Sequence, residues 1–153
     1  MIEFLPSGFY TITVAIVLAC LGAFWVSRTN AVARRAEACA VFRSTVLREL
    51  SSVYPQITDW PKDIDGFLRS KFGALQNAVE LFKPFVSAGH RQAFNDAWLN
   101  YYCTDLTPTG EQTYVRYSAS RDPHTETAQQ AGARVRRALH SNVYRFLSYA
   151  DSV

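Results

Sequence analysis

The chain has 153 residues, of which 48% are hydrophobic and 19% charged, and its formal net charge is +3. This apolar content excludes a disordered tail, and the charge is too small for a nucleic-acid-binding protein, which needs a dense basic face. Three cysteines without C-x-x-C spacing predict neither a disulfide framework nor a zinc site. No dinucleotide-binding or P-loop glycine pattern is present, so no cofactor is expected.

The first predicted element is a transmembrane helix, because residues 9–26 carry no charged side chain. A bilayer core of about 30 Å needs about 20 apolar residues in a helix. In hydrocarbon such a segment must satisfy its own backbone hydrogen bonds, which a helix does. Tyr10 and Trp25 lie near the two ends, where amphipathic rings favour the membrane interface. We expect the span to cover residues 9–27.

Three other interpretations compete with a membrane span for this segment. A cleaved signal peptide, or a lipoprotein site at Cys20, would normally follow a basic stretch, whereas only Glu3 is charged before the span. A buried helix of a soluble protein would normally show a polar stripe, and residues 9–26 show none. The sequence therefore favours an uncleaved anchor.

Basic residues follow the span and predict its orientation. Arg28, Arg34 and Arg35 come soon after it. The excess of Arg and Lys on the cytoplasmic side of membrane spans predicts residues 1–8 as an extracytoplasmic tail and residues 28–153 as a cytoplasmic domain, at the inner membrane of a bacterium. The same three arginines are expected to face lipid, where each is worth about 1 kcal/mol near an anionic surface.

Small residues recur on one side of the span, at Ala15, Ala19 and Ala23. This four-residue step lets two helix backbones approach closely and predicts a homo-oligomer formed through the anchor. Alanine is common in membrane helices, so chance explains the pattern at least as well.

After the span, the spacing of apolar residues predicts an all-α domain. Cys39, Phe42, Val46 and Leu50 share one helix face, and this helix should end before Pro55. Asn30 either caps a separate start or lies inside a helix that continues from the anchor.

The second helix of the domain is expected to have Pro61 at its first position and to end near Pro84. Gly66 and Gly73 weaken it and leave open a break into two pieces. A third helix should follow Ser87 or Gly89, and a fourth should begin after Pro123.

Four helices joined by short connections predict a small antiparallel bundle with one long irregular loop. Ten residues are expected to line its core, namely Phe42, Leu50, Phe67, Leu75, Val79, Phe82, Phe94, Trp98, Leu139 and Phe146.

Residues 103–121 are the predicted irregular loop. They contain turn-forming residues and a short run in which β-forming residues alternate, from Thr113 to Ser118. Loops on a rigid scaffold often carry binding residues, so Tyr114, Arg116 and Tyr117 are the candidate partner-binding residues. A crossover loop without a role is the alternative.

Other polar residues of the sequence resemble parts of chemical sites. Asp63, Asp65 and Gly66 resemble part of a calcium loop, but the oxygen ligand required at the twelfth position is missing, and helix-start carboxylates explain them better. Cys103, His140 and Asp151 form a nucleophilic triad only on paper. The segment from Trp60 to Asp65 looks like a motif, and the sequence attaches no function to it. A bridge between Cys39 and Cys103 stays open.

The sequence therefore predicts a single-pass membrane protein that acts by binding an unknown protein partner at the membrane face, as a tether, scaffold or regulator. The alternative is a small membrane-bound enzyme with a site near residues 103–121. No catalytic motif is found, which favours the first.

Overall fold

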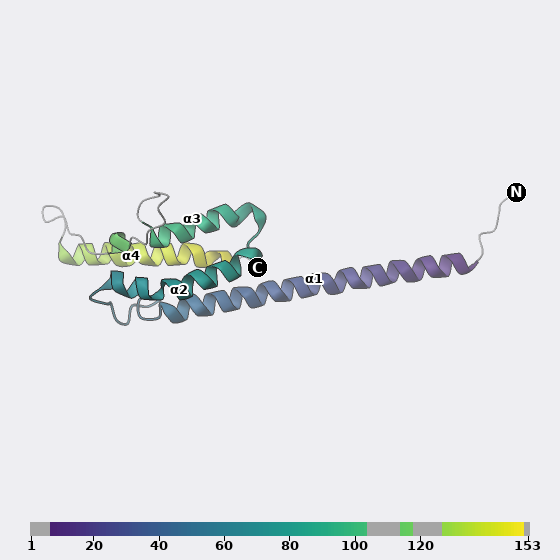
Figure 1. Ribbon diagram of the computed structural model, residues 1–153, viewed down its shortest axis with the longest axis horizontal. Coiled ribbons are helices and arrows are strands. Elements are labelled where there is room, and N and C mark those ends of the chain that lie inside the picture. Colours follow the sequence, from purple (N-terminus) through teal and green to yellow (C-terminus); the bar gives the residue numbers. More distant parts are fainter. Residues whose placement is uncertain (1–6, 104–113, 118–126, 152–153) are drawn as a thin grey trace. The chain divides into compact units, whose positions relative to one another are not determined.

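The computed structural model describes residues 7–103, 114–117 and 127–151 of the chain. In these ranges all regular structure is helical (Figure 1). The α-helices are α1 (Ser7–Glu49), α2 (Ile64–Phe82), α3 (Arg91–Tyr102) and α4 (Ala128–Leu147). Short 3-10 helices are η1 (Lys83–Phe85), η2 (Ala88–His90), η3 (Tyr114–Tyr117) and η4 (Ser148–Ala150).

The chain divides into two compact units, Met1–Glu37 and Ala38–Val153. Helix α1 contributes to both, because it runs without interruption from Ser7 to Glu49. Asn30 therefore lies inside this helix and does not cap a new one, which settles the alternative left open by the sequence.

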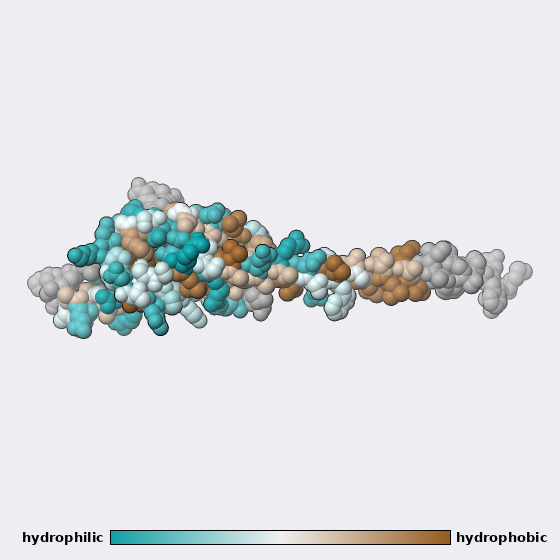
Figure 2. Space-filling view, turned by 90° about the horizontal axis from the view of Figure 1, so that it is seen from below, coloured by the Kyte–Doolittle hydropathy of each residue, from teal (hydrophilic) through white to brown (hydrophobic). Residues whose placement is uncertain are grey.

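The first unit holds the apolar part of α1. From Val14 onward this helix is long and apolar enough to cross a membrane. Its large hydrophobic side chains between Val14 and Val26 are 53–71% exposed, and they form an apolar stretch of surface (Figure 2). An apolar helix without protein cover is typical of a membrane span, and a signal sequence shares the same features.

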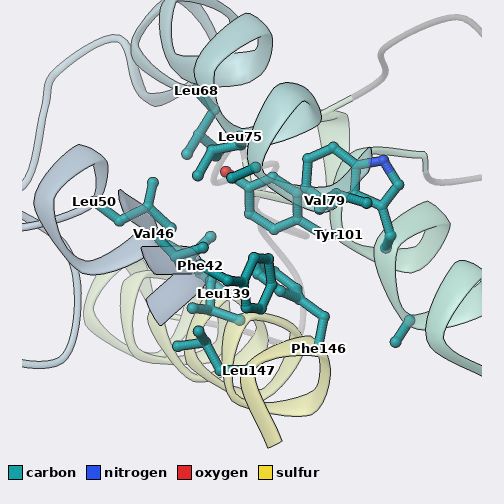
Figure 3. Close-up of a cluster of buried hydrophobic side chains, with 14 of the residues drawn as sticks. Phe42, Val46, Leu50, Leu68, Leu75, Val79, Tyr101, Leu139, Phe146 and Leu147 are labelled. Carbon is teal, nitrogen blue, oxygen red and sulfur yellow. The ribbon is translucent and has the colours of Figure 1, made fainter. Parts of the chain in front are cut away.

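The second unit has a hydrophobic core to which all four α-helices contribute (Figure 3). The ring of Phe94 meets those of Phe42 and Phe82 edge to face, with centroids 6.1 Å and 5.7 Å away. The ring of Phe146 on α4 also meets that of Phe42 edge to face, with centroids 6.2 Å apart. The core prediction is confirmed except at Phe67, which is half-buried.

The boundaries of α2 differ from those predicted. The helix begins at Ile64 and not at Pro61, because the side chain of Asp63 accepts a hydrogen bond from the backbone N–H of Gly66 at 2.9 Å. An aspartate at this N-cap position satisfies a helix donor that would otherwise lack a partner. Gly73 does not break the helix, which ends at Phe82 as predicted.

Helix α4 begins at Ala128, after Pro123 as predicted. Thr127 accepts from the backbone N–H of Gln130, and the Gln130 side chain accepts from the backbone N–H of Thr127. This reciprocal capping box fixes the start of the helix. The Asp122-Pro123 signal itself lies outside the described residues.

The predicted loop over residues 103–121 is described only at Cys103 and at η3. The alternation of β-forming residues did not produce a strand at Tyr114–Tyr117, which form a short 3-10 helix that contacts α2 and α4. No disulfide joins Cys39 and Cys103 in the described ranges.

Candidate functional site

The second unit contains a groove of about 470 Å³ that is partly open to solvent. Its volume falls in the range of about 300–1,000 Å³ typical of ligand sites. The residues that line this groove, called the Trp60 groove below, are Trp60, Pro61, Lys62, Asp63, Ile64, Asp65, Tyr117, Gly132, Val135 and Arg136. They include every residue of the Trp60–Asp65 segment to which the sequence attached no function.

Two carboxylates lie in the groove, and each already has a partner on its own helix. Asp63 caps α2 through Gly66, as described above. Asp65 accepts a hydrogen bond from Nε of Arg69 at 2.7 Å, one helical turn away. Among the described residues no group of three or more potential metal ligands converges. The two aspartates serve the start of α2, which is the role that the sequence favoured for them.

Two basic residues of the groove are placed differently. The Arg136 guanidinium lies over the indole ring of Trp60, 5.5 Å from its centroid, and Lys62 lies two residues after that indole. Both side chains are exposed, and neither forms an ion pair with any residue in the described ranges. Stacking on Trp60 holds one cation in place without neutralising its charge.

The floor of the groove is apolar apart from one hydroxyl. Val135 and Ile64 are buried, and so is Tyr117. The hydroxyl of Tyr117 donates to the backbone carbonyl of Tyr101 at 2.9 Å and accepts from Nδ2 of Asn142 at 2.8 Å. Burial raises the pKa of Tyr117 to about 12. This phenol stays protonated at neutral pH and is fully engaged, so it is unsuited to act as a nucleophile or a base.

Behind the floor, three tyrosines form a buried cluster. The ring centroid of Tyr101 lies 5.8 Å from that of Tyr114 and 6.3 Å from that of Tyr117. The hydroxyls of Tyr101 and Tyr114 are buried without a hydrogen-bond partner in the described part of the chain. Burial raises the pKa of both phenols. A buried polar atom without a partner costs stability, which distinguishes these two tyrosines from Tyr117.

Tyr117 and two residues beside the cluster, Arg116 and Asn142, also cap the C-terminal end of α3. The last carbonyls of a helix lack intrahelical donors. Here Nη1 of Arg116 and Nδ2 of Asn142 donate to the carbonyl of Asn100, at 2.9 Å and 3.2 Å, beside the bond from Tyr117 to Tyr101. The short helix η3 is thereby fixed against both α3 and α4.

The structure places the predicted partner-binding residues mainly in the core. Tyr114 and Tyr117 are 0% and 1% exposed, and Arg116 is half-buried. Partner binding by this segment stays a prediction, but the two tyrosine rings serve packing in this conformation. A three-residue tyrosine spacing matches one turn of a 3-10 helix, and this was the signal that the sequence interpretation missed.

The other predicted sites lie on α1. Arg28 and Arg34 are exposed and Arg35 is half-buried. The three alanines at positions 15, 19 and 23 are exposed on the apolar stretch. Lipid contact and self-association by these residues both stay predictions.

The observed partners of His140 and Asp151 do not support a nucleophilic triad with Cys103. The Asp151 carboxylate pairs with Arg43, and the imidazole of His140 packs against the Tyr54 ring with centroids 4.9 Å apart. These two groups are thus engaged with residues other than Cys103.

In the described ranges, fold and site together define a helical protein that has one candidate membrane span and a groove lined by apolar, aromatic, acidic and basic side chains. Comparison with models of protein families, with curated protein sequences and with solved structures found no match.

Proposed function

We propose that this protein is anchored in a membrane by α1 and acts by binding another protein at the membrane face, as a tether, scaffold or regulator. One observation carries the anchoring: the hydrophobic side chains from Val14 to Val26 are exposed, and Trp25 among them is 71% exposed. Burying an apolar side chain is favourable by about 1.5–3 kcal/mol, which a bilayer supplies where the protein does not.

The rest of the proposed architecture follows from the sequence and the packing. Residues 28–153 would form a cytoplasmic domain at the inner membrane of a bacterium, as the arginines after the span suggest. Within the second unit we propose that the helices form an antiparallel bundle, which the contacts of α3 with α4 support.

Binding is favoured over catalysis by the chemistry of the Trp60 groove. Its two carboxylates cap or pair within α2, and the Tyr117 hydroxyl has both a donor and an acceptor partner. What is left for a ligand is an apolar floor and two cations without an ion pair, beside the capping carboxylate of Asp63, which keeps its charge. This mixture of apolar and charged groups suits recognition. The alternative is an enzyme with a site near residues 103–121. Of the described residues in that segment, Tyr117 lines the groove.

Two measurements test this function. Alkaline carbonate extraction should leave the full chain in the membrane pellet, since a spanning helix resists it. Chemical cross-linking in intact membranes, followed by detergent extraction and affinity capture, should then recover a protein partner. The ratio of this partner to the captured chain should be the same in repeated experiments. The matched control is the isolated segment of residues 1–37, which carries the anchor without the second unit. Release by carbonate, or equal capture by the control, contradicts the proposal.

A further inference from the structure

We propose that the Trp60 groove binds an acidic, apolar peptide segment of a partner protein. This inference rests on the proposed function and names the chemistry of the partner. It starts from Lys62 and Arg136, the two groove cations that form no ion pair with a described residue. Two carboxylates of a ligand would form ion pairs with these cations, which the carboxylates of Asp63 and Asp65 do not.

Charge also favours an acidic partner over the rest of the second unit. The second unit, Ala38–Val153, holds 13 Lys and Arg against 11 Asp and Glu, a net charge of +2. A mild positive field of this kind steers acidic partners toward the domain and sets their orientation more than it sets their affinity.

The shape of the groove favours a peptide over a small molecule. Small-molecule sites bury about 70–90% of their ligand, whereas this groove is partly open. A peptide can continue beyond the groove and gain further contacts. The apolar floor at Ile64 and Val135 would contact apolar side chains of the peptide. The cations Lys62 and Arg136 would pair with its carboxylates. Arg136 is already oriented by the indole, so less side-chain entropy is lost on binding.

Gly132 gives the test its sharpest variant. It lies one helical turn before Arg136 on the groove wall, and a Cβ built there meets no atom within 4 Å. Gly132→Leu should therefore fill the groove without disturbing the core. Gly132→Ala is the matched control, because it changes the helix backbone in the same way and leaves most of the groove open.

A second pair of variants tests the charge. Arg136→Gln removes a groove cation. Arg145→Gln removes an exposed cation nine residues later on α4, which places it on the opposite side of that helix. Both variants change the net charge equally, so a difference between them reports position.

The assay uses the full chain in phosphatidylcholine nanodiscs and the fluorescein-labelled peptide Glu-Leu-Glu-Pro-Glu-Leu-Glu, followed by fluorescence anisotropy. We expect saturable binding that weakens about tenfold with Arg136→Gln or with a Gln-for-Glu peptide, and hardly at all with Arg145→Gln. Gly132→Leu should abolish binding and Gly132→Ala should keep it. Circular dichroism checks that each variant remains folded.

Three results would overturn the proposal: no binding, equal binding of the Glu and Gln peptides, or full binding by Gly132→Leu. Tighter binding of soluble dibutyroyl phosphatidylglycerol than of the peptide would assign the groove to a lipid headgroup and overturn it as well. Capture from membranes separates this inference from the proposed function. If Gly132→Leu captures the same partner as the wild type, the binding function stands and the groove is not its site.

Discussion

The rings of Phe42 on α1 and Phe82 on α2 are stacked, with 4.5 Å between their centroids and 9° between their planes. Phe42 is 1% exposed, and the side chain of its neighbour Val41 is 54% exposed. The end of α1 is therefore part of the core of the second unit and more than a connection to it.

Replacing Phe42 by Ala should destabilise the full chain in detergent by about 3–5 kcal/mol, because it leaves a cavity where three other phenylalanines now pack. Val41→Ala should change the free energy of unfolding by less than about 0.5 kcal/mol. Denaturant titration followed by tryptophan fluorescence measures both. Equal effects would show that α1 does not enter the core in this way.

The tyrosine cluster predicts effects of opposite sign from the same substitution. Tyr117→Phe should destabilise by about 1–3 kcal/mol, since it leaves the buried partners at Tyr101 and Asn142 unsatisfied. Tyr114→Phe should be neutral or stabilising, because its buried hydroxyl has no partner among the described residues. Thermal melts of the two variants compare them directly. A destabilising Tyr114→Phe would reveal a partner for that hydroxyl.

Stability should fall at alkaline pH. The pKa of Tyr117 is about 12 in the folded chain, above the ordinary tyrosine value of 10.0. Between these two pH values the unfolded chain loses a proton that the folded chain keeps, so the contribution is complete below pH 10 and is lost toward pH 12. Between these pH values the free energy of unfolding falls by about 1.4 kcal/mol per pH unit for each such tyrosine. Tyr117→Phe should have a shallower alkaline limb in denaturant titrations from pH 8 to pH 11. An unchanged limb contradicts the assignment.

Two glycines of α2 should respond oppositely to alanine. A Cβ at Gly66 would collide with the side chain of Asp63, whereas one at Gly73 meets nothing within 4 Å. Gly73→Ala should stabilise the protein by about 0.5–1 kcal/mol, because glycine is entropically costly inside a helix. Gly66→Ala should destabilise it through loss of the Asp63 cap, which is worth about 1 kcal/mol. Thermal melts measure both effects. The melting temperature of wild type should lie below that of Gly73→Ala and above that of Gly66→Ala.

The proposed membrane anchor can be tested with one charged substitution. Leu21 is 53% exposed in the apolar stretch of α1. Arginine at the centre of a span costs about 2.5–3.5 kcal/mol for insertion, so Leu21→Arg should shift a large fraction of the protein into the carbonate supernatant. Leu21→Ile is the control and should remain in the pellet. Full retention of Leu21→Arg would show that this stretch does not cross the bilayer.

Apolar periodicity predicted the helices and most of the core, and Pro84 predicted where α2 ends. Sequence reasoning misplaced the start of α2, because a local cap at Asp63 overrode the preference of Pro61 for a first helical position. It treated Tyr114 and Tyr117 as surface residues, because burial of a short segment depends on its neighbours in space. The Trp60 groove was beyond sequence reasoning, since Arg136 meets Trp60 only through the tertiary fold.

The two walls of that groove, residues 60–65 and 132–136, are far apart in sequence and meet only in the folded domain. Any compound that occupies the groove therefore binds the native state and not the unfolded chain. At a concentration 100 times its dissociation constant, such a compound raises the free energy of unfolding by about 2.7 kcal/mol. A thermal-shift screen of peptides and metabolites can thus find ligands of the Trp60 groove, with Gly132→Leu as the reference that should show no shift.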